Sequence, residues 1–227
     1  MNNIFDEYSR KARLFPALLC SLPFLVVKHY LIDSYFGSSL ANEFSTLLIE
    51  DTSLVLVLTY LLAQANRFIS KNLFENKSKF PTTLMLLPSS NALSPEFRIR
   101  LEQKVLNDFQ LAIPNLTDEQ SNPENTKTRL KEIVSLIINK VGNGRLLLQH
   151  NVEYGFVRNL IGGSVVSSFV SCVSTVLFAF VFPNKTAEII SIAFLIAYLI
   201  PIILSKPILN NFGKEYARIL FREYLGS

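Results

Sequence analysis

Residues 164–182 read SVVSSFVSCVSTVLFAFVF, and residues 189–205 read IISIAFLIAYLIPIILS. The two stretches are 19 and 17 residues long, and neither contains a charged residue. Crossing a bilayer core of about 30 Å takes roughly 20 apolar residues in a helix. Both stretches are therefore predicted to be transmembrane helices, and they form one hairpin because only a short loop separates them.

Two further apolar stretches precede this hairpin, with predicted spans at about residues 14–32 and 46–66. Only Lys28 and His29 interrupt the first, near its end. The second contains Glu50 and Asp51, and charges inside a span are costly and usually functional, for example in an ion path or a gate. Alternatively the second span begins near Thr52 and leaves both acids at the outer interface, which we favour.

The composition agrees with a membrane protein. The chain of 227 residues is 49% hydrophobic and 18% charged, with a mean hydropathy of +0.31. This is too apolar for a disordered chain, and two cysteines exclude a disulfide scaffold. The 22 basic and 18 acidic residues give a formal net charge of +4.

The positions of Lys and Arg predict the orientation, because these residues concentrate in short cytoplasmic flanks. They cluster before the first span, after the second and after the fourth, whereas residues 33–43 have none and residues 183–188 only Lys185. Both termini and the middle segment are predicted to face the cytoplasm of a bacterium, in a multi-pass protein of the inner membrane. The first span follows acidic residues and lacks a cleavage site, so we expect a retained helix instead of a signal peptide.

The predicted fold is an all-α membrane protein with four transmembrane helices arranged as two hairpins. A small helical cytoplasmic domain is inserted between helices 2 and 3. The predicted divisions are an N-terminal hairpin over residues 1–66, the cytoplasmic domain over 67–160, a C-terminal hairpin over 161–205 and an amphipathic cytoplasmic tail over 206–227.

The middle segment carries helix signals. Ser94 before Pro95 predicts an N-cap and a first-turn proline, and apolar residues then recur every fourth position from Phe97 to Phe109. Residues 115–125 are polar and predict a loop. Residues 130–141 form a strong amphipathic pattern that Gly142 ends, and a helical pattern resumes at residues 145–160. Residues 80–88 fit either one helical turn or an extended piece.

The tail has apolar residues on one side and basic residues on the other. Such a helix beside a span usually lies on the anionic inner leaflet, which is our expectation, and docking onto a partner is the alternative. A cytoplasmic-face cluster near the membrane is also predicted from the inner ends of adjacent spans. Its members are Arg10, Lys11, Arg13, Tyr154, Arg158 and Asn159, whose roles are either simple anchoring or a functional site.

The sequence contains no signature of enzyme chemistry. It has no phosphate-binding loop, no nucleophile elbow, and two histidines, His29 and His150, that lack partners at metal-ligand spacing. We expect no catalytic residue, cofactor, metal or small-molecule substrate. The third span is rich in small residues, which permit tight helix packing, self-association or the lining of a wet pore. Four of them are predicted to share one face: Ser164, Ser168, Cys172 and Thr175.

Three pieces of the chain resemble a group of small bacterial membrane proteins. They are residues 10–19 (RKARLFPALL), residues 81–84 with 93–98 (PTTL and LSPEFR), and residues 151–162 (NVEYGFVRNLIG). Where Val157 stands, that group often has an arginine. Members of this kind are similar to membrane effectors encoded beside reverse transcriptases in retron anti-phage systems. The resemblance implies a toxic membrane protein, held silent by a reverse transcriptase with its DNA–RNA hybrid (msDNA) and released by infection.

The sequence is compatible with two classes of function. The first is a membrane-disrupting or pore-forming effector that depolarises the inner membrane, acts as a homo-oligomer when active, and meets the reverse transcriptase–msDNA complex through its cytoplasmic domain. The second is a channel or transporter subunit, or a membrane scaffold or sensor that anchors a cytosolic partner. In both classes the lipid bilayer is a partner.

Overall fold

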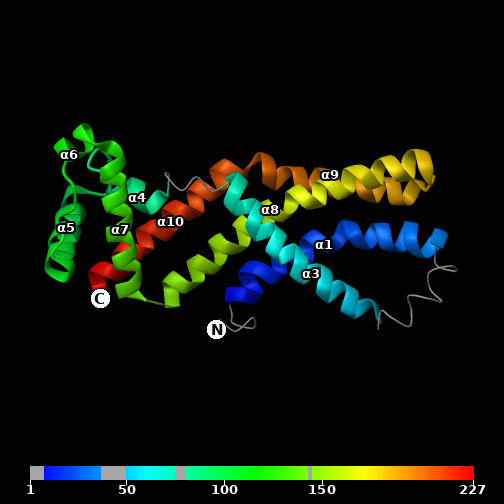
Figure 1. Ribbon diagram of the computed structural model, residues 1–227, viewed down its shortest axis with the longest axis horizontal. Helices are drawn as coiled ribbons and strands as arrows, with labels where there is room; N and C mark the ends of the chain where they lie inside the picture. Colours follow the sequence, from blue (N-terminus) through cyan, green and yellow to red (C-terminus); the bar gives the residue numbers. More distant parts are fainter. Residues whose placement is uncertain (1–7, 37–49, 75–79, 143–144) are drawn as a thin grey trace. The chain divides into compact units, whose positions relative to one another are not determined.

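The computed structural model describes residues 8–36, 50–74, 80–142 and 145–227, with side chains except those of residues 50–54 and 145–146. All regular structure in this part of the chain is helical, and it contains no strand (Figure 1). The all-α prediction is confirmed to that extent.

Within the described residues, three helical segments are long and apolar enough to cross a membrane: Ser9–Tyr35, Leu147–Val181 and Lys185–Ile203. They correspond to the first, third and fourth predicted spans. The first consists of η1 (Ser9–Leu14), α1 (Phe15–Val27) and most of η2 (Lys28–Phe36). The next two are the greater part of α8 (Arg145–Val176) with η5 (Leu177–Val181), and α9 (Lys185–Ile203).

Helix α3 (Glu50–Ile69), at the place of the second predicted span, is not among these three segments in the described part of the chain. It is 20 residues long, but Glu50 and Asp51 begin it and Gln64, Asn66 and Arg67 lie near its end. These polar residues lower its hydropathy. A fourth span therefore remains a prediction.

The chain divides into two compact units. Unit 1 comprises residues 1–75 and 155–208, and unit 2 comprises residues 76–154 and 209–227. Each unit is thus built from two separate stretches of chain. Helices α8 and α10 (Ser205–Gly226) contribute residues to both units.

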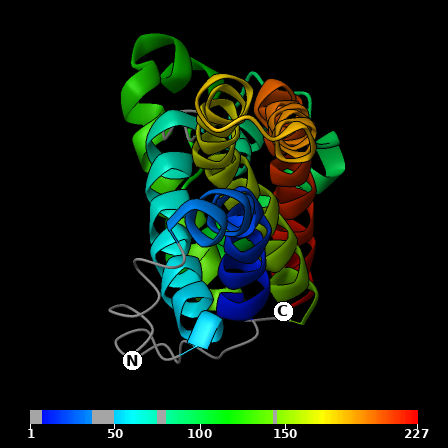
Figure 2. The same cartoon turned by 90° about the vertical axis from the view of Figure 1, so that its right-hand side faces the viewer.

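Unit 1 exposes many large apolar side chains. Helix α1 packs against α3 and against α9, and η5 contacts α9 after the short connection between them (Figures 1 and 2). Large apolar side chains point outward, and Phe169, Phe180 and Ile203 are each more than two-thirds exposed. Such a surface is costly in water and suits a bilayer.

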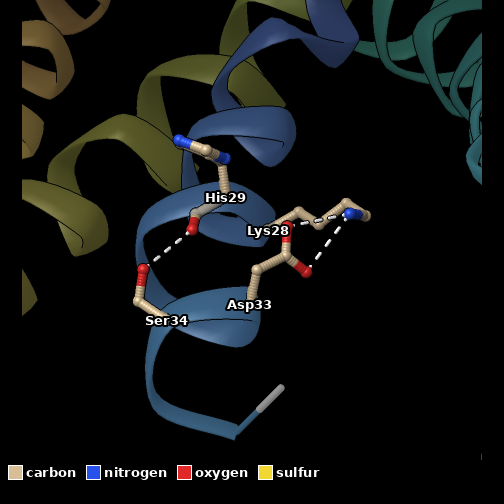
Figure 3. A network of polar contacts seen from close by, with 4 residues as sticks. All are labelled: Lys28, His29, Asp33 and Ser34. Atoms are coloured by element: carbon tan, nitrogen blue, oxygen red, sulfur yellow. Dashed lines mark hydrogen bonds and ion pairs between the residues drawn. The ribbon is translucent and has the colours of Figure 1, made fainter. Parts of the chain in front are cut away.

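The end of the first span carries a small polar network (Figure 3). In the π-helical segment η2, residues five apart share a face, and the Lys28 ammonium donates to both carboxylate oxygens of Asp33, at 2.9 and 3.2 Å. The Ser34 hydroxyl donates to the His29 carbonyl at 3.1 Å. Lys28 therefore pairs with an acid along its own helix.

Unit 2 has an ordinary apolar core. It is formed by α4 (Pro81–Leu86), α5 (Pro95–Phe109), α7 (Pro123–Val141), the start of α8 and the end of α10. The amphipathic face predicted within residues 130–141 is confirmed, since Leu130, Ile133 and Ile137 are buried in this core. The Ser94 hydroxyl caps α5 by accepting from the Phe97 N–H at 3.3 Å, as predicted. Residues 81–86 are helical, so the helical alternative for residues 80–88 is confirmed and the extended one is wrong.

One prediction in this region is wrong. Residues 115–125 are mostly helical, because Asn115 and Asp118 form a capping box that starts α6 (Leu116–Ser121), and Asn122 caps α7. Short polar helices bury no apolar face, so apolar periodicity does not reveal them. Helix α5 ends at Phe109 because Gln110 adopts the left-handed conformation.

The expected position of the tail on the inner leaflet is also wrong. The apolar side of α10 lies in the core of unit 2, where Ala217, Leu220, Phe221 and Tyr224 are fully buried. This face is covered by protein and is not available to lipid. The opposite, basic side of α10 remains exposed at Lys214, Arg218 and Arg222.

Candidate functional site

A seam of small and polar residues runs along α8 within unit 1. Its members recur every fourth residue, so each is the surface neighbour of the next along the helix: Gly155, Asn159, Gly163, Ser167 and Ser171. All five are buried. Small residues at this spacing allow two membrane helices to approach closely.

The glycines are required by this close approach. A Cβ atom added at Gly163 would lie 2.4 Å from the Cys20 sulfur and 2.5 Å from the Asn66 amide nitrogen. At Gly162 it would lie 2.3 Å from the backbone oxygen of Asn66, and at Gly155 2.9 Å from the Cβ of Ala12. Helix α8 therefore contacts both the first span and the end of α3 at backbone distance.

Two prolines in the first span explain its hydrogen bonds to other helices. Proline has no N–H, so Pro16 cannot bond the carbonyl of Ala12 four residues earlier, and Pro23 cannot bond that of Leu19. Asn159 of α8 donates its side-chain N–H to the Ala12 carbonyl at 2.6 Å, and the Tyr198 hydroxyl of α9 donates to the Leu19 carbonyl. Neighbouring helices thus satisfy the freed carbonyls.

The hydroxyls of α8 are satisfied within the unit. Ser167 donates to the Cys20 carbonyl at 2.8 Å, which adds a third bond to the first span. Ser164, Ser171, Ser174 and Thr175 each donate to the carbonyl four residues earlier on α8, as does Ser168. The polar side chains of this helix are therefore held inside the packed unit.

Asn66 of α3 lies against this seam. It is fully buried where α3 meets the two glycines of α8, and neither its amide nitrogen nor its amide oxygen has an oxygen or nitrogen partner. Its polar neighbour is the Cys20 thiol, a weak hydrogen-bonding group. A buried amide left without partners costs about 1–3 kcal/mol per unsatisfied group.

Among the described residues of unit 1, the hydroxyls of Thr59 and Ser191 and the side-chain oxygen of Asn159 are also buried without a hydrogen-bond partner. Together with Asn66 they leave the interior under-satisfied for an apolar environment. A rearrangement that supplies partners to these groups would be favourable. The seam is therefore our candidate functional site.

The face predicted to line a pore or pack helices is divided by the structure. Ser164 and Ser168 are buried, Thr175 is half-buried and Cys172 is exposed. The buried seam instead contains Gly163, Ser167 and Ser171, each one position before a residue of the predicted face. The stripe of small residues was visible in the sequence, but its orientation depends on where α1 and α3 pack.

The predicted cytoplasmic-face cluster is brought together in part. The bond from Asn159 to Ala12 places Asn159 beside the segment that carries Arg10, Lys11 and Arg13. Arg10 and Lys11 are exposed, whereas the Arg13 guanidinium lies over the Tyr8 ring, 5.3 Å from its centre. Arg158 is half-buried on α8 in the same unit, and Tyr154 belongs to unit 2.

The predicted intramembrane acids, Glu50 and Asp51, begin α3, but their side chains lie outside the described ones. Among the described residues, no group of His, Cys, Asp and Glu side chains could hold a metal ion.

Sequence reasoning missed Asn66 and Tyr198. A signal for Tyr198 was present, since Pro23 within an apolar span frees a carbonyl that some neighbouring donor must satisfy. Asn66 lay at the polar end of a predicted span, where an interfacial asparagine is unremarkable. No family model, curated protein or solved structure matches this chain.

Proposed function

We propose that this chain is a membrane-disrupting effector of a bacterial anti-phage system of the retron type. A reverse transcriptase–msDNA complex holds it inactive through the cytoplasmic segment, and release during infection lets it depolarise the inner membrane as a homo-oligomer. The resemblance of residues 10–19, 81–84 with 93–98, and 151–162 to such effectors supports the system, and the apolar helices of unit 1 support action in a membrane.

The observation that carries the proposal is the fully buried Asn66, whose amide has only the weakly hydrogen-bonding Cys20 thiol as a polar neighbour. In an apolar interior its two amide atoms destabilise the packing that encloses them. An arrangement in which Asn66 meets water or a second copy of the chain gives those atoms partners. A membrane unit with a strained resting packing and a better-satisfied alternative suits a protein that switches from silent to permeabilising.

The test is induced expression of the full chain in bacteria, with membrane potential and viability followed together and insertion checked by membrane fractionation. We expect rapid depolarisation by the wild-type chain. Asn66→Leu should abolish depolarisation. The leucine side chain needs no hydrogen-bond partner in the resting packing, and it gains no hydrogen bond when it meets water. Gln64→Leu, two residues away at an exposed position of α3, is the matched control and should depolarise like the wild type.

Three results would count against the proposal. If the inserted wild-type chain left the potential intact, an autonomous effector would be excluded and a scaffold or transporter subunit favoured. If Asn66→Leu depolarised as well as the wild type, the seam would not be the switching element. If co-expression of the neighbouring genes did not reduce the depolarisation, restraint by a nucleoprotein partner would be excluded.

A further inference from the structure

A surface pocket of unit 2 lies between the start of α5 and the exposed side of α10. Its volume is about 210 Å³. Its lining combines two guanidinium groups, one hydroxyl residue and an apolar wall, and consists of Ala92, Leu93, Ser94, Phe97, Arg218 and Arg222. Neither the membrane seam nor the proposed switching uses this pocket.

The two arginines lack counter-charges. Arg218 and Arg222 stand four residues apart on α10, so their side chains share a face, and like charges at that spacing repel each other. In the described part of the chain neither forms an ion pair or a hydrogen bond with an acidic side chain, although Glu215 lies three residues before Arg218. Two guanidinium groups at one pocket are suited to a phosphate, which each can bind through paired N–H groups.

The start of α5 adds to the same preference. Ser94 is the N-cap of this 15-residue helix, and Pro95 follows it. In its first turn Pro95 has no N–H and the Phe97 N–H is bonded to the Ser94 hydroxyl, so the cap leaves only the Glu96 N–H, but the positive end of the helix dipole still favours an anion. The guanidinium pair therefore provides most of the attraction for an anion, and the dipole of α5 adds to it.

The rim beside α5 is held in place before any ligand arrives. The Arg98 guanidinium donates to the carbonyls of Leu87 at 2.8 Å and of Ser90 at 3.2 Å. The Ser89 backbone N–H and hydroxyl donate to the two carboxylate oxygens of Glu119, at 2.8 and 2.7 Å. A preordered rim lowers the entropy cost of binding.

The third wall is apolar. Leu93 and Phe97 are half-buried and pack on the core of unit 2. An inorganic anion would leave this wall unused, whereas a flat organic group attached to the phosphate can contact the Phe97 ring. We propose that the pocket binds an organic phosphate monoester, with the phosphate between Arg218 and Arg222 at the start of α5 and the organic group against Phe97 and Leu93.

The experiment is calorimetric titration of the full chain in phosphatidylcholine nanodiscs with adenosine monophosphate, inorganic phosphate and adenosine. We expect adenosine monophosphate to bind more tightly than either fragment. Arg218→Gln and Arg222→Gln should each weaken it by about tenfold to a hundredfold, the loss expected for one hydrogen-bonded charge pair. Lys214→Gln removes the same charge one turn earlier on the same side of α10, outside the pocket, and should change the affinity less than twofold (about 0.4 kcal/mol).

Other results would overturn the proposal. They include no binding of adenosine monophosphate, binding of inorganic phosphate with equal affinity, or an equal loss in Lys214→Gln, which would indicate only general charge attraction. Repeating the titration in phosphatidylglycerol nanodiscs tests a lipid source of the phosphate. If those lipids compete with adenosine monophosphate only when both arginines are present, the pocket belongs to a lipid headgroup. If a short single-stranded oligonucleotide binds through both arginines and the mononucleotide does not, it belongs to nucleic acid.

Discussion

At the scale of single residues, the membrane unit is organised by backbone groups that a proline leaves free. Pro23 removes the donor for the Leu19 carbonyl, and Tyr198 supplies one from α9. Pro16 and Asn159 repeat the arrangement at the Ala12 carbonyl. The sequence placed prolines in the first span, but it did not indicate which helix would lie beside each freed carbonyl.

A double-mutant cycle tests this pairing. Tyr198→Phe should lower the free energy of unfolding by about 1 kcal/mol, the usual value for a hydrogen bond between membrane helices. In the Pro23→Ala background the loss should be much smaller, because the alanine introduced there has a backbone N–H that can donate to the Leu19 carbonyl. Both values come from unfolding of the detergent-solubilised chain, and equal losses in the two backgrounds would contradict the pairing.

Gly162→Ala tests the close approach of α8 and α3. The new methyl group would meet the Asn66 backbone oxygen at 2.3 Å, and backbone cannot move aside as a side chain can. We expect a loss of about 1–3 kcal/mol in the free energy of unfolding. Gly226→Ala is the control, because nothing lies within 4 Å of a Cβ added there. Equal stabilities of the two variants in a thermal melt would refute the close packing.

At the scale of elements, α5 and α7 were predicted well because each has a regular apolar face that meets a core. Helix α6 was missed because a capping box forms it without an apolar face. The tail shows a different limit: its amphipathic pattern was predicted correctly, but such a pattern does not tell whether lipid or protein covers the apolar side. Tyr224 and Phe221 lie in the core of unit 2.

The end of α10 is fixed to two other helices through Asp108 at the end of α5. One carboxylate oxygen lies 2.6 Å from the Lys140 ammonium of α7, and the other accepts from the Tyr224 hydroxyl at 2.8 Å. The Tyr224 ring also stacks on Phe109. Hydrogen bonds from Lys140 and Tyr224, assisted by the charges of Lys140 and Lys104, lower the pKa of Asp108 below its usual value.

This lowered pKa makes the stability of unit 2 depend on pH. The folded state binds the proton on Asp108 more weakly than the unfolded state, so the stabilisation is complete above the ordinary aspartate pKa of about 3.9. It is lost as the pH falls through the lowered folded value. We expect Asp108→Asn to melt at a lower temperature than the wild type at neutral pH and to lose less stability between neutral and acidic pH. Glu132→Gln, at an exposed site, should keep the acid dependence of the wild type, and the same slope in Asp108→Asn would contradict the network.

At the scale of the whole chain, the number of membrane crossings depends on α3. In the part of the chain that the structure describes, three helical segments are long and apolar enough, and α3 carries polar residues near both ends. Hydropathy alone does not decide such a helix, because Asn66 lies buried against the glycines of α8 instead of facing lipid. The Lys and Arg flanks predict four crossings, and then the N-terminus and residue 122 share one side. With three crossings they lie on opposite sides.

Labelling of single cysteines with a membrane-impermeant maleimide distinguishes these topologies in intact and permeabilised cells. Cys172→Ser removes the exposed native thiol, and Cys20 is buried and serves as the unlabelled background. Cysteines are then introduced by Asn2→Cys, Asn122→Cys and Asn184→Cys. We expect residues 2 and 122 to react only after permeabilisation and residue 184 to react in intact cells, because basic flanks stay cytoplasmic. Labelling of residue 2 in intact cells, with residue 122 still protected, would mean that α3 does not cross and that the chain has three spans.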